Sequence, residues 1–192
     1  MSDTSLPDHL GGHMNKVHTD RATLLYLREK YGLQTMVDIG CGPGDMVQIA
    51  DMRGMDVIGV DGDWTLENTW VALGIKEKVF LHDFTQGEFN TTSESFDLGW
   101  SVEVLEHIDE EYLPNVMELF GKCNVVIATA APPGHGGHHH VNEQPLEYWV
   151  DKFAEVGLIY DPEETSHIRN NVSQMRKPFM QKNGMLFKKE GM

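Results

Sequence analysis

Residues 35–45 read TMVDIGCGPGD, and this stretch decides the fold. Thr35 to Ile39 is a short apolar run of the length of a buried β-strand. Glycines follow at positions 40, 42 and 44, and glycine lets a backbone turn tightly and approach a ligand that a Cβ atom would exclude. The stretch therefore predicts a buried strand, a glycine-rich turn and a helix that begins near Pro43.

The same order of strand and helix recurs along the chain. Short apolar runs predict further strands at 56–60, 78–82, 96–100 and 124–130, and a late edge strand at 186–189. Apolar residues spaced three or four apart predict helices at 20–31, 43–53, 64–73, 113–120 and 146–153, with Thr19 capping the first and Asn142 the last. Parallel strands need such crossover connections. The pattern predicts an α/β fold, doubly wound around a mostly parallel sheet.

Composition and charge exclude several classes of protein. Among 192 residues, 15 are basic and 30 acidic, so the net charge of −15 repels a phosphate backbone, and the mildly basic stretch 176–189 is too weak to reverse this. No apolar run approaches the roughly 20 residues needed to cross a bilayer. Cys41 and Cys123 are too few for a disulfide scaffold, and residues 1–10 show no secretory signal. We expect a cytoplasmic protein without nucleic-acid or membrane partners.

Acidic residues follow the second and third predicted strands. Ligands of doubly wound sheets bind beyond the carboxyl ends of the strands. Asp61 stands about 20 residues after Gly40, the spacing at which an acid contacts ribose hydroxyl groups. Asp83 suits the exocyclic amino group of adenine, and Phe84 suits the face of its ring. The order of these loops predicts a ligand that contains a nucleoside.

A dinucleotide is disfavoured by the residue at position 45. The Gly-x-Gly-x-x-Gly fingerprint needs a glycine there, and the chain has Asp45. A carboxylate in the first helical turn would repel the pyrophosphate that the helix N-terminus should hold. S-adenosylmethionine has a cationic sulfonium and an amino acid end in place of the pyrophosphate, so it avoids this conflict.

The segments VDIGCGPG (37–44), GVD (59–61), HDF (82–84) and VLEHI (104–108) resemble the successive motifs of class I S-adenosylmethionine-dependent methyltransferases. The resemblance spans residues 19–157. It implies a Rossmann-like fold with a seven-stranded sheet and S-adenosylmethionine as the cofactor. The cofactor contacts that it implies are the backbone of Gly40, Cys41 and Gly42, the ribose at Asp61 and Gly62, the adenine at Asp83 and Phe84, the methionine end near Asp38, and Ser101 and Val102 alongside.

Candidate catalytic residues lie in two segments. Methyl transfer from a sulfonium is an in-line displacement, so alignment of the acceptor supplies most of the catalysis, and a hydroxyl acceptor also gains from a general base. Glu103 and His107 follow the fourth predicted strand, and His138 and His140 belong to the loop APPGHGGHHHVN (131–142). Glu103 and His107 are therefore candidate bases, with His138 and His140 beside them. The alternatives are that Glu106 and His107 open a helix and that the loop is flexible and solvated.

The same loop offers a possible metal site. His138 and His140 can share a face, and His135 can join them if the glycines turn the chain. Since no carboxylate stands at a convincing ligand spacing, we predict no metal, although zinc remains an alternative.

The N-terminal segment is set apart from the predicted domain by its composition. Residues 1–18 are rich in glycine and histidine and form either a lid over the cofactor or a flexible segment, leaving 19–192 as one domain.

Two motifs that identify particular methyl acceptors are missing from the chain. Residues 99–102 lack the Asn/Asp-Pro-Pro-aromatic signature of base methylation, and 120–123 lack the Leu-Lys-Pro-Gly-Gly element of quinone and sterol methylation. We therefore expect O-methylation of a sugar or other small polar metabolite. The alternative is a non-catalytic regulatory or partner subunit that binds S-adenosylmethionine.

Overall fold

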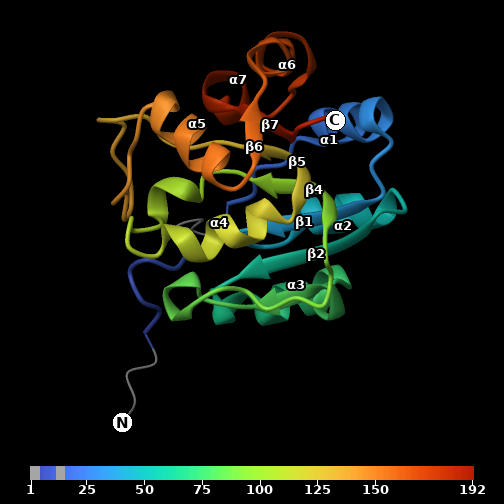
Figure 1. Cartoon of the computed structure of the whole chain (residues 1–192). Coiled ribbons are helices and arrows are strands. Elements are labelled where there is room, and N and C mark those ends of the chain that lie inside the picture. Colours follow the sequence, from blue (N-terminus) through green and yellow to red (C-terminus); the bar gives the residue numbers. More distant parts are fainter. Residues whose placement is uncertain (1–4, 12–15) are drawn as a thin grey trace.

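The computed structural model describes residues 5–11 and 16–192 and contains one seven-stranded sheet (Figure 1). Its strand order is β3-β2-β1-β4-β5-β7-β6. The neighbours from β3 to β5 pair in parallel, while β7 pairs antiparallel with both β5 and β6. This confirms the doubly wound, mostly parallel α/β fold. The strands are β1 Thr35–Ile39, β2 Asp56–Asp61, β3 Val79–Leu81, β4 Phe96–Ser101, β5 Cys123–Ala128, β6 Leu158–Tyr160 and β7 Met185–Lys189.

The strand predicted at 186–189 exists as β7, but its predicted place at the edge of the sheet is wrong. β7 lies between β5 and β6, and β6 forms the edge. The sequence analysis did not predict β6, because a three-residue strand is too short to show a pattern and its central Ile159 is 55% exposed. A short, partly polar edge is also a common protection against pairing with other chains.

Seven α-helices and five short helical turns connect the strands of the described chain. The α-helices are α1 Arg21–Tyr31, α2 Asp45–Met52, α3 Glu67–Leu73, α4 Leu113–Gly121, α5 Leu146–Glu155, α6 Pro162–His167 and α7 Phe179–Asn183. The turns are Trp64–Leu66, Lys76–Lys78, Phe84–Gln86, Leu105–His107 and Ile168–Val172. None of the helices in the described parts of the chain is long and apolar enough to cross a bilayer.

Two of the predicted helix caps are wrong. Asp20, and not Thr19, caps α1, because its Oδ1 accepts the backbone N–H of Thr23 at 3.2 Å. Asn142 does not cap α5, which begins at Leu146 after Pro145. Asn142 is instead buried, with 2% of its surface exposed.

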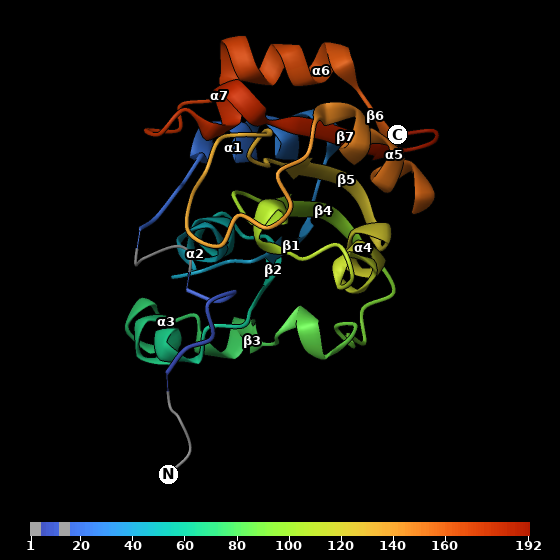
Figure 2. The same cartoon turned by 90° about the vertical axis from the view of Figure 1, so that its left-hand side faces the viewer.

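Helices cover both faces of the sheet (Figure 2). On one face, Leu24 and Leu27 of α1, Val47 of α2 and Trp70 of α3 belong to one apolar cluster. On the other face, the buried stripes of α4 and α5 form a second cluster that includes Phe120, Phe153 and Phe187. Each fully buried side chain of this size contributes roughly 1.5–3 kcal/mol to folding. The two cores hold the strands so that their carboxyl ends meet at one edge.

The turn after β1 brings the backbone close to the segment after β4. Gly40 has a φ of +72°, and a Cβ atom there would lie 2.4 Å from Cγ2 of Val104. Gly44 has a φ of +89°, and a Cβ atom there would lie 2.4 Å from Cδ1 of Ile75. The left-handed conformation and the close contacts together explain why glycine occupies these positions. The glycines therefore allow the turn to pack closely against Val104 and Ile75.

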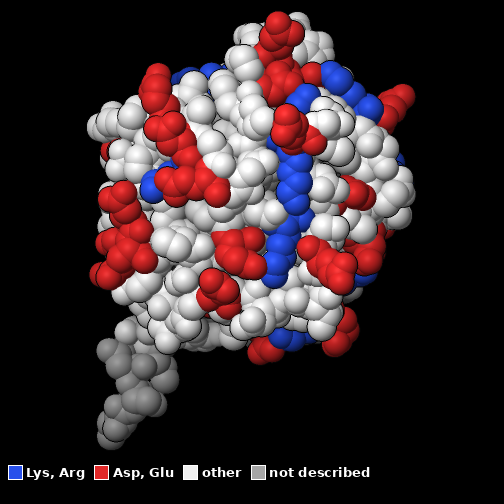
Figure 3. All heavy atoms as spheres, viewed as in Figure 1, with Lys and Arg blue, Asp and Glu red and all other residues white. Residues whose placement is uncertain are grey.

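Charge is distributed unevenly over the face of the molecule in Figure 3. Acidic side chains gather in several groups on this face, and Lys and Arg side chains form a narrow band between them. The basic residues are thus interleaved with acidic ones on this face, as expected for a chain with a net charge of −15. That nucleic acid is not a partner stays a prediction.

Candidate active site

A cavity of about 640 Å³ opens at the carboxyl ends of β1, β2 and β4. The structure brings all but one of the predicted site residues to its wall. On the predicted cofactor side these are Asp38, Gly40, Cys41, Gly42, Asp61, Gly62, Asp83, Phe84 and Val102. On the predicted acceptor side they are Glu103, His107, His138 and His140.

Ser101 is the exception, because its side chain lies behind the cavity wall. It is completely buried, and its hydroxyl donates to the backbone carbonyl of Ile39 at 3.0 Å. Its neighbours Trp100 and Val102 do line the cavity. Successive side chains of a strand point to opposite faces, so Ser101 ties β4 to β1 instead of facing a ligand.

Asp61 holds the glycine turn from one side. One oxygen of its carboxylate accepts the N–H of Gly42 at 2.6 Å, and the other accepts the N–H of Asp63 at 2.9 Å. Trp70 holds the turn from the core, because its Nε1–H donates to the carbonyl of Gly42 at 2.9 Å. The backbone N–H and the carbonyl of Gly42 are therefore both fixed by hydrogen bonds, and the carboxylate of Asp61 lies beside Gly42 in the cavity wall. This arrangement suits a ligand with a vicinal diol such as ribose.

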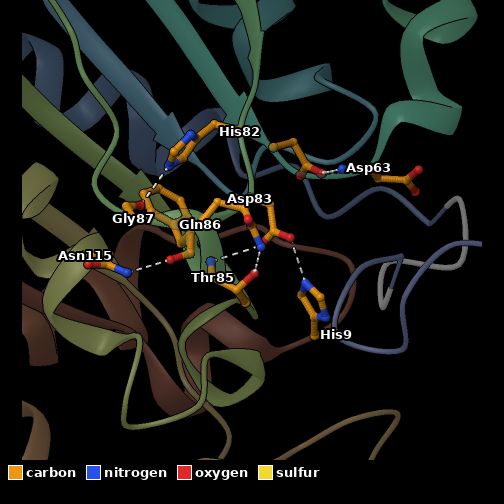
Figure 4. A network of polar contacts seen from close by, with 10 residues as sticks. His9, Asp63, His82, Asp83, Thr85, Gln86, Gly87 and Asn115 are labelled. Carbon is orange, nitrogen blue, oxygen red and sulfur yellow. Dashed lines mark hydrogen bonds and ion pairs between the residues drawn. The ribbon is translucent and has the colours of Figure 1, made fainter.

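Asp83 lies in a polar network that reaches the N-terminal segment (Figure 4). Its carboxylate accepts the N–H of Thr85 at 2.9 Å and lies 3.0 Å from Nε2 of His9. Burial acts to raise the pKa of Asp83, but the hydrogen bonds from His9 and Thr85 outweigh it and lower the pKa. Asp83 is thus an ionised acceptor at the position expected for an adenine amino group. The sequence analysis missed His9 as its partner.

The N-terminal segment lies along the mouth of the cavity. His9, Leu10 and Gly11 line it, and the carbonyl of Asp8 lies 3.0 Å from Nε2 of His138 in the histidine loop. These contacts are consistent with the prediction that residues 1–18 form a lid over the cofactor. Part of that prediction, residues 1–4 and 12–15 with His13, lies outside the described residues. The role of the segment as a lid stays a prediction.

Asp38 is a buried acid beside the glycine turn. Only 4% of its surface is exposed, and burial, followed by the charge of Asp61, raises its pKa to about 8. A protonated carboxyl group is therefore the stable form near neutral pH. A cationic ammonium group placed against it would favour the ionised form, which fits the methionine end of the expected cofactor.

We expect Asp38→Asn to change how stability depends on pH. Between an unfolded-state pKa of about 4 and the folded-state pKa of about 8, the folded protein holds one proton more at Asp38. The free energy of unfolding therefore falls as the pH rises, by up to about 1.4 kcal/mol per pH unit from this group. Urea unfolding of the ligand-free protein at pH 5, 6 and 7 measures the slope, which Asp38→Asn makes shallower. Asp56→Asn, at the exposed start of β2, leaves the slope unchanged; equal slopes in all three proteins would contradict the assignment.

Glu103 has a strained backbone at the acceptor side of the cavity. Its φ is +58°, and only one other described residue besides glycine, His139, has a positive φ. Thr129 fixes this geometry, because its Oγ1 accepts the N–H of Glu103 and donates to Oε1 of the same residue, both at 2.8 Å. Such backbone strain costs about 1–3 kcal/mol and is concentrated at functional sites. Glu103 lines the cavity, and one oxygen of its carboxylate is held by the buried Thr129.

Glu106 joins His107 and His140 in a second cluster. The three side chains have oxygen and nitrogen atoms that lie within 4.8 Å of one another, and the two imidazole rings meet edge to face at 4.8 Å. Burial, together with the charge of Glu103, raises the pKa of Glu106 to about 8. Burial, followed by the charge of His140, lowers the pKa of His107 to about 4. Sequence reasoning treated Glu106 as the start of a helix and missed its place in the site.

The histidine loop is held by Glu143. Its carboxylate accepts the N–H groups of Gly134 at 2.8 Å and Gly136 at 2.6 Å and lies 2.8 Å from Nδ1 of His140. His138 points instead toward Asp8. The ring of His135 stacks on that of His140 at 6.2 Å, and His140 also reaches a cluster with Glu106 and His107. Zinc binding by the histidines of the loop stays an untested alternative.

The sheet order and the cavity at the carboxyl ends of its strands define the class I methyltransferase fold. The sequence agrees, because residues 37–127 match the profile of a protein family described as a methyltransferase domain. The matched residues thus correspond to a methyltransferase domain with the class I fold, and S-adenosylmethionine is the cofactor that such a domain implies. A search of the curated proteins gives no significant match.

Solved structures show the same fold at low sequence identity. A TehB-like methyltransferase from Corynebacterium glutamicum is 17% identical with a TM-score of 0.61, covering 88% of this chain and 87% of that one. The magnesium protoporphyrin IX methyltransferase from Synechocystis PCC 6803, with bound S-adenosylhomocysteine, is 15% identical with a TM-score of 0.61, covering 97% and 88%. The plantazolicin methyltransferase BpumL is 13% identical with a TM-score of 0.61, covering 88% and 82%. The last two are named for different acceptors, so the fold does not select one.

Proposed function

We propose that this protein methylates a hydroxyl group of a small polar acceptor, such as a sugar, with S-adenosylmethionine as the donor. The observation that carries the proposal is the wall of carboxylate and imidazole groups facing the glycine turn. Glu103, His107 and His140 line the same cavity as Asp38 and Asp61. A polar acceptor can add hydrogen bonds to these groups beyond those of Glu103 with Thr129 and of His140 with Glu143, and an apolar acceptor cannot.

The reaction needs alignment and removal of one proton. When bound, the cofactor supplies an electrophilic methyl group on its sulfonium. The acceptor oxygen forms a bond to the methyl carbon, the carbon–sulfur bond breaks, and its electron pair stays on sulfur. The hydroxyl proton must leave to a group of this chain. Glu103 is the candidate general base, because the hydroxyl group of Thr129 holds it in place through two hydrogen bonds.

Two lysine side chains in the cavity wall favour an acceptor with a negative charge. Lys16 and Lys177 also line the cavity, in a chain whose net charge is −15. Their positive charges favour an acceptor that carries an anionic group, because opposite charges attract across a pocket that excludes some water. A phosphorylated or carboxylated sugar therefore belongs in the first set of compounds to test.

The test is transfer of labelled methyl groups from S-adenosylmethionine to panels of sugars, sugar phosphates, amines and thiols. We expect products in the hydroxyl panels that resist mild hydrolysis as methyl ethers do. Glu103→Gln should lower kcat on the order of 100-fold while the affinity for S-adenosylmethionine stays within about twofold, since a general base contributes about 10²- to 10⁴-fold. Glu147→Gln, on the exposed start of α5, is the matched control.

Two results would contradict the proposal. Methylation confined to the amine or thiol panel would assign a different acceptor atom. Tight binding of S-adenosylmethionine without transfer to any panel would favour the regulatory or partner subunit that the sequence analysis kept as its alternative.

A further inference from the structure

Glu106 is a buried carboxylate to which no side chain of the described residues donates a hydrogen bond. It has no exposed surface, and the backbone N–H groups of Glu106 and Ala131 approach its oxygens without making a hydrogen bond of good geometry. Buried polar groups in native proteins are nearly always paired, so an unpaired one calls for an explanation such as a bound ion. The carboxylate sits where two imidazole groups approach it.

The neighbours of Glu106 come from two separate segments. His107 follows it in the turn Leu105–His107, and His140 arrives from the loop between β5 and α5. One ligand atom from each residue lies within 4.8 Å of the others. Around a shared ion with bonds of about 2.1 Å, tetrahedral ligand atoms lie about 3.4 Å apart. Binding of one ion by all three residues would draw these atoms closer together.

His140 is oriented as metal-binding histidines are. Its Nδ1 lies 2.8 Å from Oε1 of Glu143, which leaves Nε2 as the atom available to a ligand. Histidine ligands of metals usually have their second ring nitrogen on a carboxylate or carbonyl, which fixes the ring and its tautomer. Gly137 makes room for the ring, because a Cβ atom there would lie 2.3 Å from Nε2 of His140.

We propose that Glu106, His107 and His140 bind a divalent transition-metal ion that contacts the acceptor hydroxyl group. One carboxylate and two imidazoles suit zinc, manganese and similar ions, and three protein ligands leave a coordination position open for substrate. His107 and His140 line the cavity, so this position faces the predicted acceptor. Binding of the ion does not depend on the proposed function. The contact between the ion and the acceptor hydroxyl group does rest on the proposed function.

The proposal departs from our expectation that the chain binds no metal, which nothing in the structure tests. That expectation rested on the loop 131–142, where no carboxylate stands at a ligand spacing. In the structure the carboxylate comes from Glu106, and the backbone N–H groups of Val141 and Asn142 donate to the carbonyl of the same residue at 3.0 Å. These two bonds dock the end of the histidine loop onto the turn that carries Glu106 and His107.

The test is a metal titration of the full chain after treatment with a chelator. Zinc, manganese and cobalt salts are titrated separately by calorimetry, and cobalt binding is followed by its visible absorption. We expect one ion per chain, and at least 100-fold weaker binding in His140→Ala and in Glu106→Gln. His135→Ala is the matched control, because His135 belongs to the same loop and stacks on His140 at 6.2 Å but contributes no atom to the cluster; the affinity of this variant for the ion should stay within about threefold of the wild type.

Two outcomes of the titration would overturn the site. The first is that the chelator-treated wild type takes up no ion with 1:1 stoichiometry. The second is that His135→Ala and His140→Ala weaken binding equally, which would indicate loose binding by the loop alone. If Glu106→Gln does not fold, as judged by circular dichroism, His140→Ala decides between these outcomes.

A second measurement tests the contact with the acceptor. Removal of the ion should lower methyl transfer at least tenfold, leave the affinity for S-adenosylmethionine within about twofold, and be reversed by adding the ion back. Transfer that proceeds at an unchanged rate without the ion would overturn this part. A failure of the proposed function is distinguishable, because it abolishes transfer to every hydroxyl compound while the titration still reports the ion.

Discussion

Asp61→Ala should weaken the binding of S-adenosylmethionine at least 100-fold. The substitution removes the acceptor of the Gly42 N–H at 2.6 Å and of the Asp63 N–H at 2.9 Å, so the glycine turn loses its fixed position. It also removes the carboxylate expected to accept the ribose hydroxyl groups. Hydrogen bonds to a charged group contribute about 1.5–3 kcal/mol each, and about 2.7 kcal/mol corresponds to a factor of 100 in affinity. Calorimetry with S-adenosylmethionine and S-adenosylhomocysteine measures the effect.

Asp61→Asn tests how much of this effect comes from the charge of the carboxylate, and Asp56→Asn is the control. Asn at position 61 keeps the size of the side chain and removes its charge, so its effect should fall between those of the wild type and the alanine variant. Since the charge of Asp61 is the second cause of the raised pKa of Asp38, Asp61→Asn should also lower that pKa. Asp56, at the other end of β2, is the control. An unchanged affinity in Asp61→Ala would remove this residue from the cofactor site.

The fold could be predicted where periodicity and turn residues agree over several residues. β1 was predicted to the residue, because a short, mostly apolar run is followed by a glycine-rich turn, and α4 was predicted within one residue, because its apolar residues keep a helical spacing. The region after residue 157 was not predicted in the same way. There β6 has three residues, α6 is polar with six, and α7 has five, so no period can be read in any of them.

Residues of the site could be predicted from the sequence where they directly follow a parallel strand, because the order of the strands then places them at the cavity. Asp61 and Asp83 follow parallel strands, so the sheet itself brings them to the cavity. The pairing of Glu106 with His140 and that of His9 with Asp83 could not be found in this way, because the two members of each pair lie far apart in the sequence. Ser101 could have been assigned better: Val102 faces the cavity, and the alternation of a strand turns its neighbour to the other side.

Trp70→Ala should be the most destabilising of the substitutions considered, and it should also weaken cofactor binding. Trp70 is 1% exposed, and its indole N–H donates to the carbonyl of Gly42. Loss of a large buried aromatic side chain costs about 3–5 kcal/mol, which lowers Tm by roughly 10 °C in a chain of this length. Thermal unfolding followed by circular dichroism measures the shift. Trp64→Ala is the control, because Trp64 lies in the preceding turn and is 42% exposed, and its Tm should stay nearly unchanged.

Trp70→Phe separates the two roles of the indole ring. Phenylalanine keeps most of the packing but leaves the carbonyl of Gly42 without its donor, which costs about 1–3 kcal/mol. Because the same glycine position binds Asp61 through its N–H, the affinity for S-adenosylmethionine should fall along with the stability. A phenylalanine variant that loses stability but binds the cofactor normally would show that Asp61 alone positions the turn. One that keeps both would show that the indole contributes packing only.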